Sequence, residues 1–196
     1  EYEAIYTVTL FTGMREGEVL GLTWDCIDFK SGVITIKQQL QKVRSSGVKY
    51  TLASTKNGKS RIIAPASYVM QVLTAQKKTQ NEQRLKAGPA WSNPFNLVFT
   101  NALGKNLCAQ TVYLHFKKLA AAAGVPSARF HDLRHSYAVA ALRSGDDIKT
   151  VQENLGHHTA AFTLDTYAHV TEQMRRESAR RMDNFIEGIQ AAKNAK

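Results

Sequence analysis

The apolar positions along the first third of the chain change from a helical to a strand-like spacing. Residues 1–12 place Ile5, Val8 and Leu10 at helical spacing, and Gly13 is a suitable stop for this helix. Helix-forming residues at 18–22 predict a second, shorter helix. Three runs rich in strand-forming residues follow, at residues 33–39, 48–52 and 61–64. The first third is therefore expected to contain a small antiparallel sheet.

Two turn signals divide these predicted strands. Ser45-Ser46-Gly47 lies between the first and second, and residues 39–44 add enough length for an extended ribbon. Asn57-Gly58, the strongest hairpin signal in the chain, lies between the second and third. Lys56 directly precedes this turn, so we expect it at the tip of a two-stranded ribbon.

The rest of the chain shows mostly helical spacing. Helices are predicted at residues 67–86, 109–123, 129–144, 148–155, 159–167 and 172–192, with a short strand at 97–99. Within residues 109–123, the side chains expected on the buried face are Val112, Phe116, Leu119 and Ala123. The predicted class is α+β, mostly α: a helical domain with a small antiparallel sheet or β-hairpin near its N-terminal third.

Charge and composition narrow the choice of partner. The 196 residues suffice for one sizeable core, and 26 Lys and Arg against 16 Asp and Glu give a net charge of +10. Nucleic acid is favoured over an anionic membrane, because no basic amphipathic segment carries a strong apolar face. No apolar run approaches the length of a membrane span. Cys26 and Cys108 have no metal or disulfide spacing, which indicates reduced cysteines in a cytosolic protein.

Candidate chemistry is concentrated in residues 129–169. The residues that carry it are His131, Arg134, His135, His157, His158 and Tyr167. Histidine changes its charge near neutral pH, arginine is a fixed cation, and the tyrosine oxygen is a potential nucleophile. Far upstream, Arg15 lies at the junction of two predicted helices, where its side chain could project into a cleft or simply face solvent.

Three interpretations of this set compete. A metal site is the weakest, because His131 and His135 lack the intervening Glu of HExxH and Arg134 would repel a cation. A non-enzymatic DNA-binding module explains the net charge but leaves the histidines and the tyrosine without a role. Phosphoryl transfer with a tyrosine nucleophile uses two arginines for the phosphate, a histidine for the phenol proton and a lysine for the leaving oxygen. It leaves the fewest residues unexplained.

The ordered segments GMREGEVLGLTWDCIDF, STKNGKSR, HDLRHSYA, LGHH and TLDTYAH resemble the tyrosine recombinase (phage integrase) family. The resemblance covers essentially the whole chain and is greatest to integrases of conjugative transposons. It implies that Arg15 and Arg134 bind the scissile phosphate, and that Lys56, or Lys59 close by, is the general acid. His131 would be the general base or a phosphate ligand, His157 a phosphate hydrogen-bond donor, and Tyr167 the nucleophile that forms a 3′-phosphotyrosyl intermediate. His135 and His158 receive no catalytic role.

The resemblance also implies an organisation and a biological setting. Residues 1–196 would be a single catalytic domain, and the N-terminal DNA-binding domain or domains of full-length members would lie outside this chain, which begins with Glu1 rather than Met. The implied partner is double-stranded DNA at recombination sites, with no metal, ATP or other cofactor, in the bacterial cytoplasm on the nucleoid. The reaction would serve excision and integration of a mobile element. A type IB topoisomerase is the enzymatic alternative.

Two elements are expected to contact partners. The helix at about 172–192 would dock on a neighbouring protomer, giving a dimer on each site and a tetramer in synapsis. Its apolar residues, Met182, Phe185, Ile186 and Ile189, would be buried there or, alternatively, against the core of their own chain. The long strand pair between residues 33 and 52 is expected to form an additional ribbon that contacts DNA or a partner.

Overall fold

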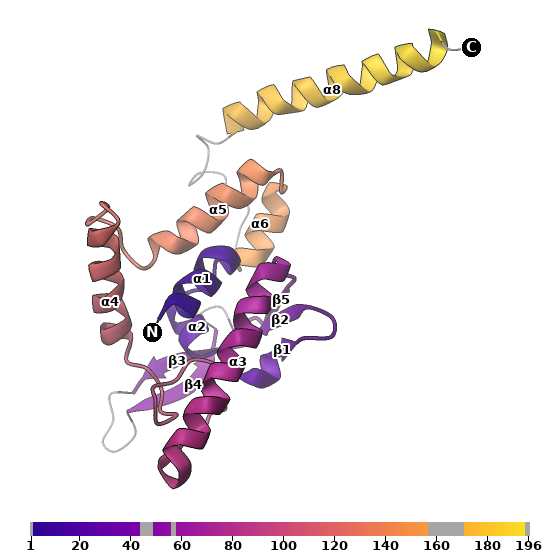
Figure 1. Cartoon of the computed structure of the whole chain (residues 1–196). Helices are drawn as coiled ribbons and strands as arrows, with labels where there is room; N and C mark the ends of the chain where they lie inside the picture. The colour runs from indigo at the N-terminus through magenta and orange to yellow at the C-terminus, as the bar shows by residue number, and fades with distance from the viewer. Residues whose placement is uncertain (1, 44–48, 56–57, 157–170, 195–196) are drawn as a thin grey trace.

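A computed structural model describes residues 2–43, 49–55, 58–156 and 171–194 of the chain. The first helix, α1 (Glu3–Thr12), ends at Gly13, whose left-handed φ of 66° and N–H bond to the Thr9 carbonyl form the predicted stop. A short helix α2 (Glu16–Leu20) and a 3₁₀ turn η1 (Trp24–Cys26) lead into the strands. Figure 1 shows α1 between the sheet region and the later helices α5 and α6.

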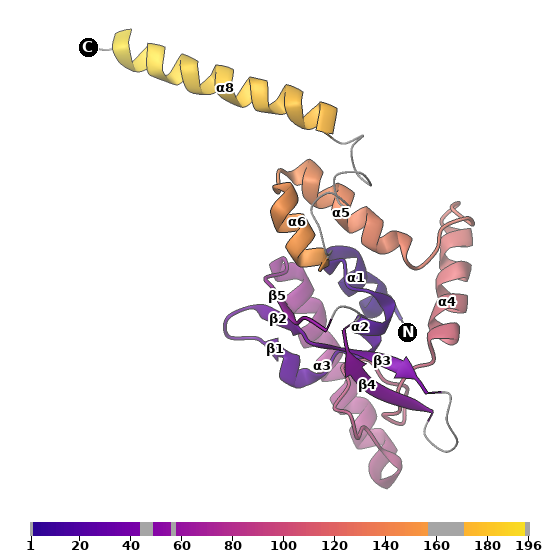
Figure 2. The same ribbon diagram turned by 180° about the vertical axis from the view of Figure 1, so that it is seen from behind.

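The sheet region consists of two separate antiparallel units. β1 (Ile27–Asp28), β2 (Val33–Ile36) and β5 (Arg61–Ile63) form a three-stranded sheet in the order β1-β2-β5. β3 (Gln38–Lys42) and β4 (Tyr50–Ser54) form a two-stranded ribbon in which Leu40 faces Leu52. Figure 2 shows this ribbon at the side of the molecule away from β1.

The predicted pairing of the second and third strand runs across Asn57-Gly58 is wrong. β4 pairs with β3, while β5 pairs with β2, in a register that places Ile34 opposite Ile63. Both isoleucines are buried. The third run therefore joins β2, because this pairing places Ile63 in the same core as Ile34. A turn remains after β4, where the Gly58 N–H bonds to the Thr55 carbonyl at 2.8 Å.

The predicted helices after the sheet are present with small shifts of their ends. They are α3 (Ser67–Ala87), a 3₁₀ turn η2 (Gly88–Ala90), α4 (Ala109–Ala122), α5 (Asp132–Ser144), α6 (Ile148–Leu155) and α8 (Thr171–Asn194). Gly145 and Gly156 end α5 and α6 in left-handed conformations, and Asp147 caps α6 by accepting the Thr150 N–H. The class is α+β, mostly α, as predicted. The predicted helix at 159–167 lies outside the described residues.

Two predictions about this region are wrong. Residues 97–99 form no regular strand; Leu97 makes only an isolated bridge to Thr23. In α4, Val112 and Phe116 are buried as expected, but Leu119 is exposed and Ala120 takes the inward position instead. Ala123 lies beyond the end of α4 and is also exposed. The inward face is thus set by how α4 packs on the core, which favours the small Ala120 there.

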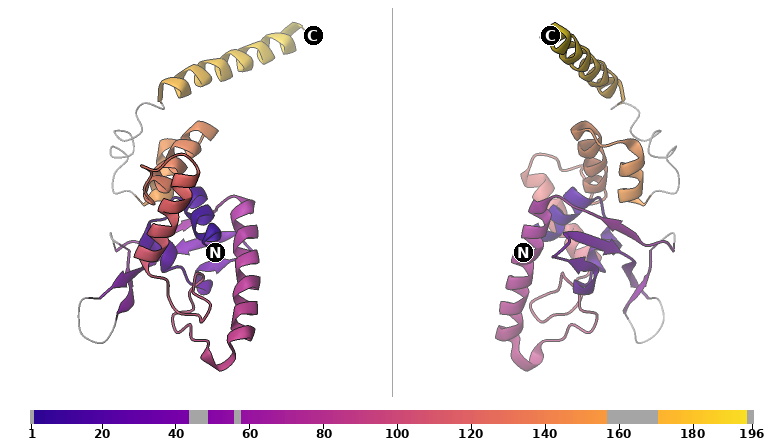
Figure 3. Two further views of the ribbon diagram at one scale, coloured as in Figure 1. Left: turned by 60° about the vertical axis from the view of Figure 1, so that its left-hand side comes forward. Right: turned by 90° about the vertical axis from the view of Figure 1, so that its right-hand side faces the viewer.

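The buried side chains form two clusters. The larger joins α1, the three-stranded sheet, α3 and α4, whereas the smaller joins α5 to α6 through Ala138, Leu142, Val151 and Leu155. Figure 3 shows α3 along one side of the body and the β3–β4 ribbon on the other. None of the helices in the described ranges is long and apolar enough to cross a bilayer.

Candidate active site

The side chain of Arg134 is buried where three helices meet. It lies in the first turn of α5 and is 3% exposed. Its Nη1 donates to the Gly13 carbonyl at 2.5 Å, and its Nη2 donates to the Leu155 carbonyl at 2.6 Å. The guanidinium thus joins the ends of α1 and α6 to the start of α5, and this fixes its position.

Arg15 reaches the same place from the start of α2. Its Nη1 bonds to Oε1 of Glu18 at 2.8 Å, and its Nη2 donates to the Gly156 carbonyl at 3.3 Å. Because Leu155 and Gly156 are consecutive, the two guanidinium groups meet at adjacent carbonyls at the end of α6. The fold therefore brings together two arginines that are 119 positions apart in the sequence, as the numbers 15 and 134 show.

Glu18 and Arg61 complete this charge network, and the sequence patterns did not identify either. Glu18 is 1% exposed, and Arg61 binds it with two hydrogen bonds, of 3.0 and 2.6 Å, while its Nε donates to the Asn154 carbonyl at 2.7 Å. The strand pattern at residues 61–64 includes Arg61 but does not indicate this contact. The available signal was Glu18 itself, an acidic residue between Gly17 and the apolar pair Val19 and Leu20.

The Glu18 carboxylate is held in its charged form. Burial by itself raises the pKa of Glu18, but the hydrogen bonds and charges of Arg61 and then of Arg15 outweigh it, so the pKa lies below its ordinary value. A buried anion between two guanidinium groups reduces their mutual repulsion. Glu18 can therefore hold Arg15 and Arg61 side by side at the end of α6 although both are cations.

His131 lies three residues before Arg134. It immediately precedes α5, is exposed, and its ring lies 4.9 Å from that of His135 at an angle of 85°. Partial desolvation, followed by the positive charges of His135 and Arg134, lowers the pKa of His131. The imidazole is therefore neutral at pH 7 and can accept a proton.

Three of the six candidate residues, Lys56, His157 and Tyr167, lie outside the described residues, as does His158. Their roles stay predictions. The structure does describe the residues that directly precede Lys56 and His157 in the sequence. Gly156, which accepts the Arg15 bond, is the last described residue before His157, and Thr55 and Gly58 flank the Lys56 segment. Lys59, the alternative general acid, is exposed.

Tyr137 is a second tyrosine close to the arginine cluster. Its hydroxyl accepts a hydrogen bond from Asn154 at 3.0 Å, and its ring packs against Gly13. Burial raises the pKa of the Tyr137 phenol. Its side chain is thus part of the packing between α1, α5 and α6, which is a structural role.

Comparison with known proteins gives consistent matches. The phage integrase family matches residues 1–174. A tyrosine recombinase XerC-like protein of Caldanaerobacter subterraneus is 31% identical over 194 residues, which cover 94% of this chain and 49% of that protein. The ICEBs1 integrase of Bacillus subtilis is 27% identical over 188 residues, again 94% of this chain and 49% of that protein. This chain spans about half the length of these relatives.

A solved structure has the same fold. The Tn1549 transposon integrase, in complex with transposon right end DNA, superposes with a TM-score of 0.74 at 24% identity, over 93% of this chain and 59% of that chain.

Proposed function

Because this chain belongs to the phage integrase family, we propose that it is the catalytic domain of a site-specific tyrosine recombinase that cuts and rejoins DNA during integration and excision of a mobile element. The observation that carries this proposal is the meeting of Arg15 and Arg134 at the Leu155 and Gly156 carbonyls, directly before His157. Two fixed cations at one point suit a phosphodiester, whose charge rests on two non-bridging oxygens.

The proposed chemistry is a transesterification at one phosphate. The Tyr167 oxygen forms a bond to phosphorus while the bond from phosphorus to the 5′ oxygen breaks, which leaves a 3′-phosphotyrosyl enzyme and a free 5′ hydroxyl. His131 accepts the phenol proton or binds the phosphate, and Lys56 donates a proton to the departing oxygen. His157 donates a hydrogen bond to the phosphate. The reverse attack by a 5′ hydroxyl rejoins the strand without ATP, because one phosphoester replaces another.

Two features of the described site support these roles. The pKa of His131 is lowered, so its imidazole is in the proton-accepting form at neutral pH. The Arg15 side chain is 24% exposed, whereas that of Arg134 is almost fully buried. Arg15 would therefore be the more accessible phosphate ligand. Arg134 would bind the phosphate from the buried side of the site and would also join α5 to the ends of α1 and α6.

Double-stranded DNA is the proposed partner. The net charge of +10 favours it, and the Tn1549 integrase, a structural neighbour, is bound to transposon DNA. The β3–β4 ribbon is proposed to add a contact to DNA or to a neighbouring protomer. We place the reaction in the bacterial cytoplasm on the nucleoid, with a dimer on each site and a tetramer in synapsis.

The exposed face of α8 supports docking on a neighbouring protomer rather than on its own core. Met182, Phe185, Ile186 and Ile189 are between 44% and 65% exposed. Large apolar side chains gathered on one exposed helix face are typical of a protein–protein contact. The single catalytic domain of residues 1–196 would thus include an element that is buried only in the assembly.

The test is trapping of the covalent intermediate with a nicked duplex that carries the recombination site of the element. Cleavage next to the nick releases a short fragment, so the adduct accumulates. We expect an adduct that resists denaturation, is lost in Tyr167→Phe and persists in Tyr137→Phe. An adduct that survives Tyr167→Phe would contradict the proposed nucleophile.

Relaxation of a supercoiled plasmid without the recombination site distinguishes the topoisomerase alternative. A recombinase is expected to join two site-bearing duplexes and to leave that plasmid supercoiled. The absence of any adduct in the unchanged protein would favour the non-catalytic DNA-binding module.

A further inference from the structure

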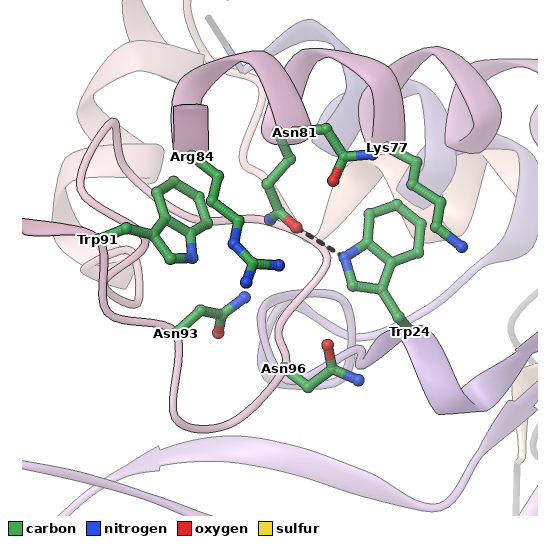
Figure 4. A pocket seen from close by; sticks show the side chains of 8 residues that line it. Trp24, Lys77, Asn81, Arg84, Trp91, Asn93 and Asn96 are labelled. Atoms are coloured by element: carbon green, nitrogen blue, oxygen red, sulfur yellow. Dashed lines mark hydrogen bonds between the residues drawn. The ribbon is translucent and has the colours of Figure 1, made fainter. Parts of the chain in front are cut away.

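A polar cavity is lined by residues of the C-terminal half of α3. Figures 1 and 3 show that this half of α3 points away from α5 and α6. The volume of the cavity is about 430 Å³, within the range of small-ligand sites. Side chains from η1, the C-terminal half of α3 and the loop after η2 line it (Figure 4). The chain contains two tryptophans, Trp24 and Trp91, and both line this cavity.

Both indole groups are held in place by the surrounding structure. Trp24 Nε1 donates to Gln80 Oε1 at 2.7 Å, and the buried Gln80 is anchored by bonds from its Nε2 to the Leu97 and Val98 carbonyls at 2.9 and 3.0 Å. Trp91 lies against Gly104, where an added Cβ would come within 2.8 Å of the indole ring. Because both indoles already have fixed positions, neither loses conformational freedom when a ligand binds, and this lowers the entropic cost of binding.

The charge of the cavity is positive. Its charged lining residues are Lys77 and Arg84, and none of its lining residues is acidic. Lys77 Nζ lies 5.4 Å from the centre of the Trp24 ring, whereas the side chain of Arg84 has no ion pair or hydrogen bond within the described part of the chain. Figure 4 shows the Arg84 guanidinium pointing into the space between the two indoles. A guanidinium in that position offers a bidentate site for a phosphate.

Amide side chains complete the lining. Asn81 and Asn96 are exposed, and in Figure 4 they flank the space between the indoles from above and below. Asn96 has a φ of 56°, the one positive value among the non-glycine residues that the structure describes. In this left-handed conformation, the Asn96 carbonyl accepts a hydrogen bond from the backbone N–H of Trp24 at 3.0 Å. The strained residue therefore helps to position Trp24.

We propose that this cavity binds a nucleotide, with the base stacked on an indole and the phosphate bound by Arg84, while Lys77 adds positive charge at the rim beside Trp24. A planar base suits an indole face because stacking does not depend on which base is present. The amides of Asn81 and Asn96 supply both donors and acceptors for the edge of a base. The nucleotide can come from two sources, a free nucleoside monophosphate or an unpaired nucleotide of a DNA strand.

This site is separate from the arginine cluster and does not depend on strand cleavage. It requires neither Tyr167 nor the charge network of Glu18. A Tyr167→Phe variant is therefore expected to bind nucleotide as the unchanged protein does, so failure of the nucleotide site and failure of the proposed recombinase chemistry can be told apart.

Calorimetric titration of the chain with AMP tests the proposal, with adenosine and inorganic phosphate as partial ligands. We expect AMP to bind, and Arg84→Ala to weaken AMP binding by about tenfold because a charge-assisted bidentate contact is lost. Trp91→Leu is expected to weaken it by a similar factor through lost stacking. The matched control is Lys86→Ala, which removes an exposed cation of α3 outside the cavity and should leave the affinity unchanged.

A labelled single-stranded dT pentamer distinguishes the two sources. Binding that AMP displaces and that Arg84→Ala weakens assigns the site to an unpaired nucleotide of DNA, whereas binding of AMP alone assigns it to a free nucleotide. The proposal is overturned if neither probe shows binding that depends on Arg84, or if inorganic phosphate binds as tightly as AMP. Circular dichroism and thermal unfolding of each variant verify that it is folded.

Discussion

Glu18 connects residues that the sequence places in different motifs. Its carboxylate binds Arg15 and Arg61, and these two arginines in turn bind the Gly156 and Asn154 carbonyls at the end of α6. At the residue scale, the geometry of the proposed phosphate site thus depends on a buried anion that would itself never contact the phosphate.

Replacement of Glu18 by glutamine should destabilise the protein. The substitution keeps the shape but leaves two guanidinium groups near each other without their shared counter-charge. We expect the free energy of unfolding to fall by roughly 3 kcal/mol, as when one partner of a buried ion pair is removed. Urea denaturation measures this change. The control is Asp25→Asn, which breaks the half-exposed pair with Lys37 and should cost no more than about 0.5 kcal/mol.

The contribution of Glu18 should depend on pH in a defined direction. Its pKa in the folded protein is below the ordinary value of 4.5, so the folded state favours the charged form. The stabilisation is therefore complete above the ordinary pKa and is lost as the pH falls through the folded-state pKa. The difference in unfolding free energy between the unchanged protein and Glu18→Gln should be constant near neutral pH and should narrow below about pH 4.5. A difference that narrows as the pH rises would contradict this assignment.

At the scale of elements, the C-terminal end of α1 packs against both α5 and α6. Gly13 has its carbonyl bonded to Arg134, and its α-carbon faces Tyr137 of α5 and Leu155 of α6. An added Cβ would come within 2.5 Å of the Tyr137 ring and 2.7 Å of the Leu155 side chain. Glycine is thus required at this position by both backbone conformation and space.

Comparison of Gly13→Ala with Gly32→Ala separates these two requirements. Both glycines have positive φ, 66° and 70°, but nothing lies within 4 Å of a Cβ added to Gly32. Gly32→Ala should therefore cost only the left-handed strain, about 1 kcal/mol, whereas Gly13→Ala should cost roughly 3 kcal/mol because overpacking is added. Thermal or urea unfolding of the two variants gives the comparison. Equal losses of unfolding free energy in the two variants would show that α5 and α6 can shift enough to accept a methyl group at position 13.

At the scale of the whole molecule, the apolar face of α8 is exposed among the residues that the structure describes. Phe185 and Ile186 are 65% and 44% exposed, and charged residues such as Arg180 and Arg181 are exposed on the same helix. A face of this kind gains stability only when another surface covers it.

The double substitution Phe185→Asp and Ile186→Asp should prevent assembly without unfolding the chain. Both side chains are exposed, so the unfolding free energy should change by less than about 1 kcal/mol. On DNA with two recombination sites, light scattering should report a smaller complex than for the unchanged protein. Asn184→Asp adds a negative charge on the opposite side of α8 and should assemble normally. Unchanged assembly of the double variant would place the protomer contact elsewhere.

Local patterns predicted those elements whose signals are local. The predicted stop at Gly13 is present, and the helices predicted to end at residues 144 and 155 do end there, directly before Gly145 and Gly156. Such signals act within one turn of backbone, so they do not depend on the rest of the fold. The pairing of β5 with β2 was missed because residues 25 positions or more apart decide it, as the match of Ile36 with Arg61 and Ile34 with Ile63 shows. On the inner face of α4, the structure has Ala120 where the sequence pattern predicted Leu119, and this difference has the same non-local origin.

By itself, the sequence determined the fold class, the family and two of the cations at the centre of the site, because residue identity and order are enough for these. Only the tertiary structure decided that Arg15 and Arg134 meet at the end of α6, that Glu18 binds Arg15 and Arg61 there, and that both tryptophans line one cavity. Each of these depends on contacts between segments far apart in the chain. No local spacing encodes such contacts, since burial and packing settle them together.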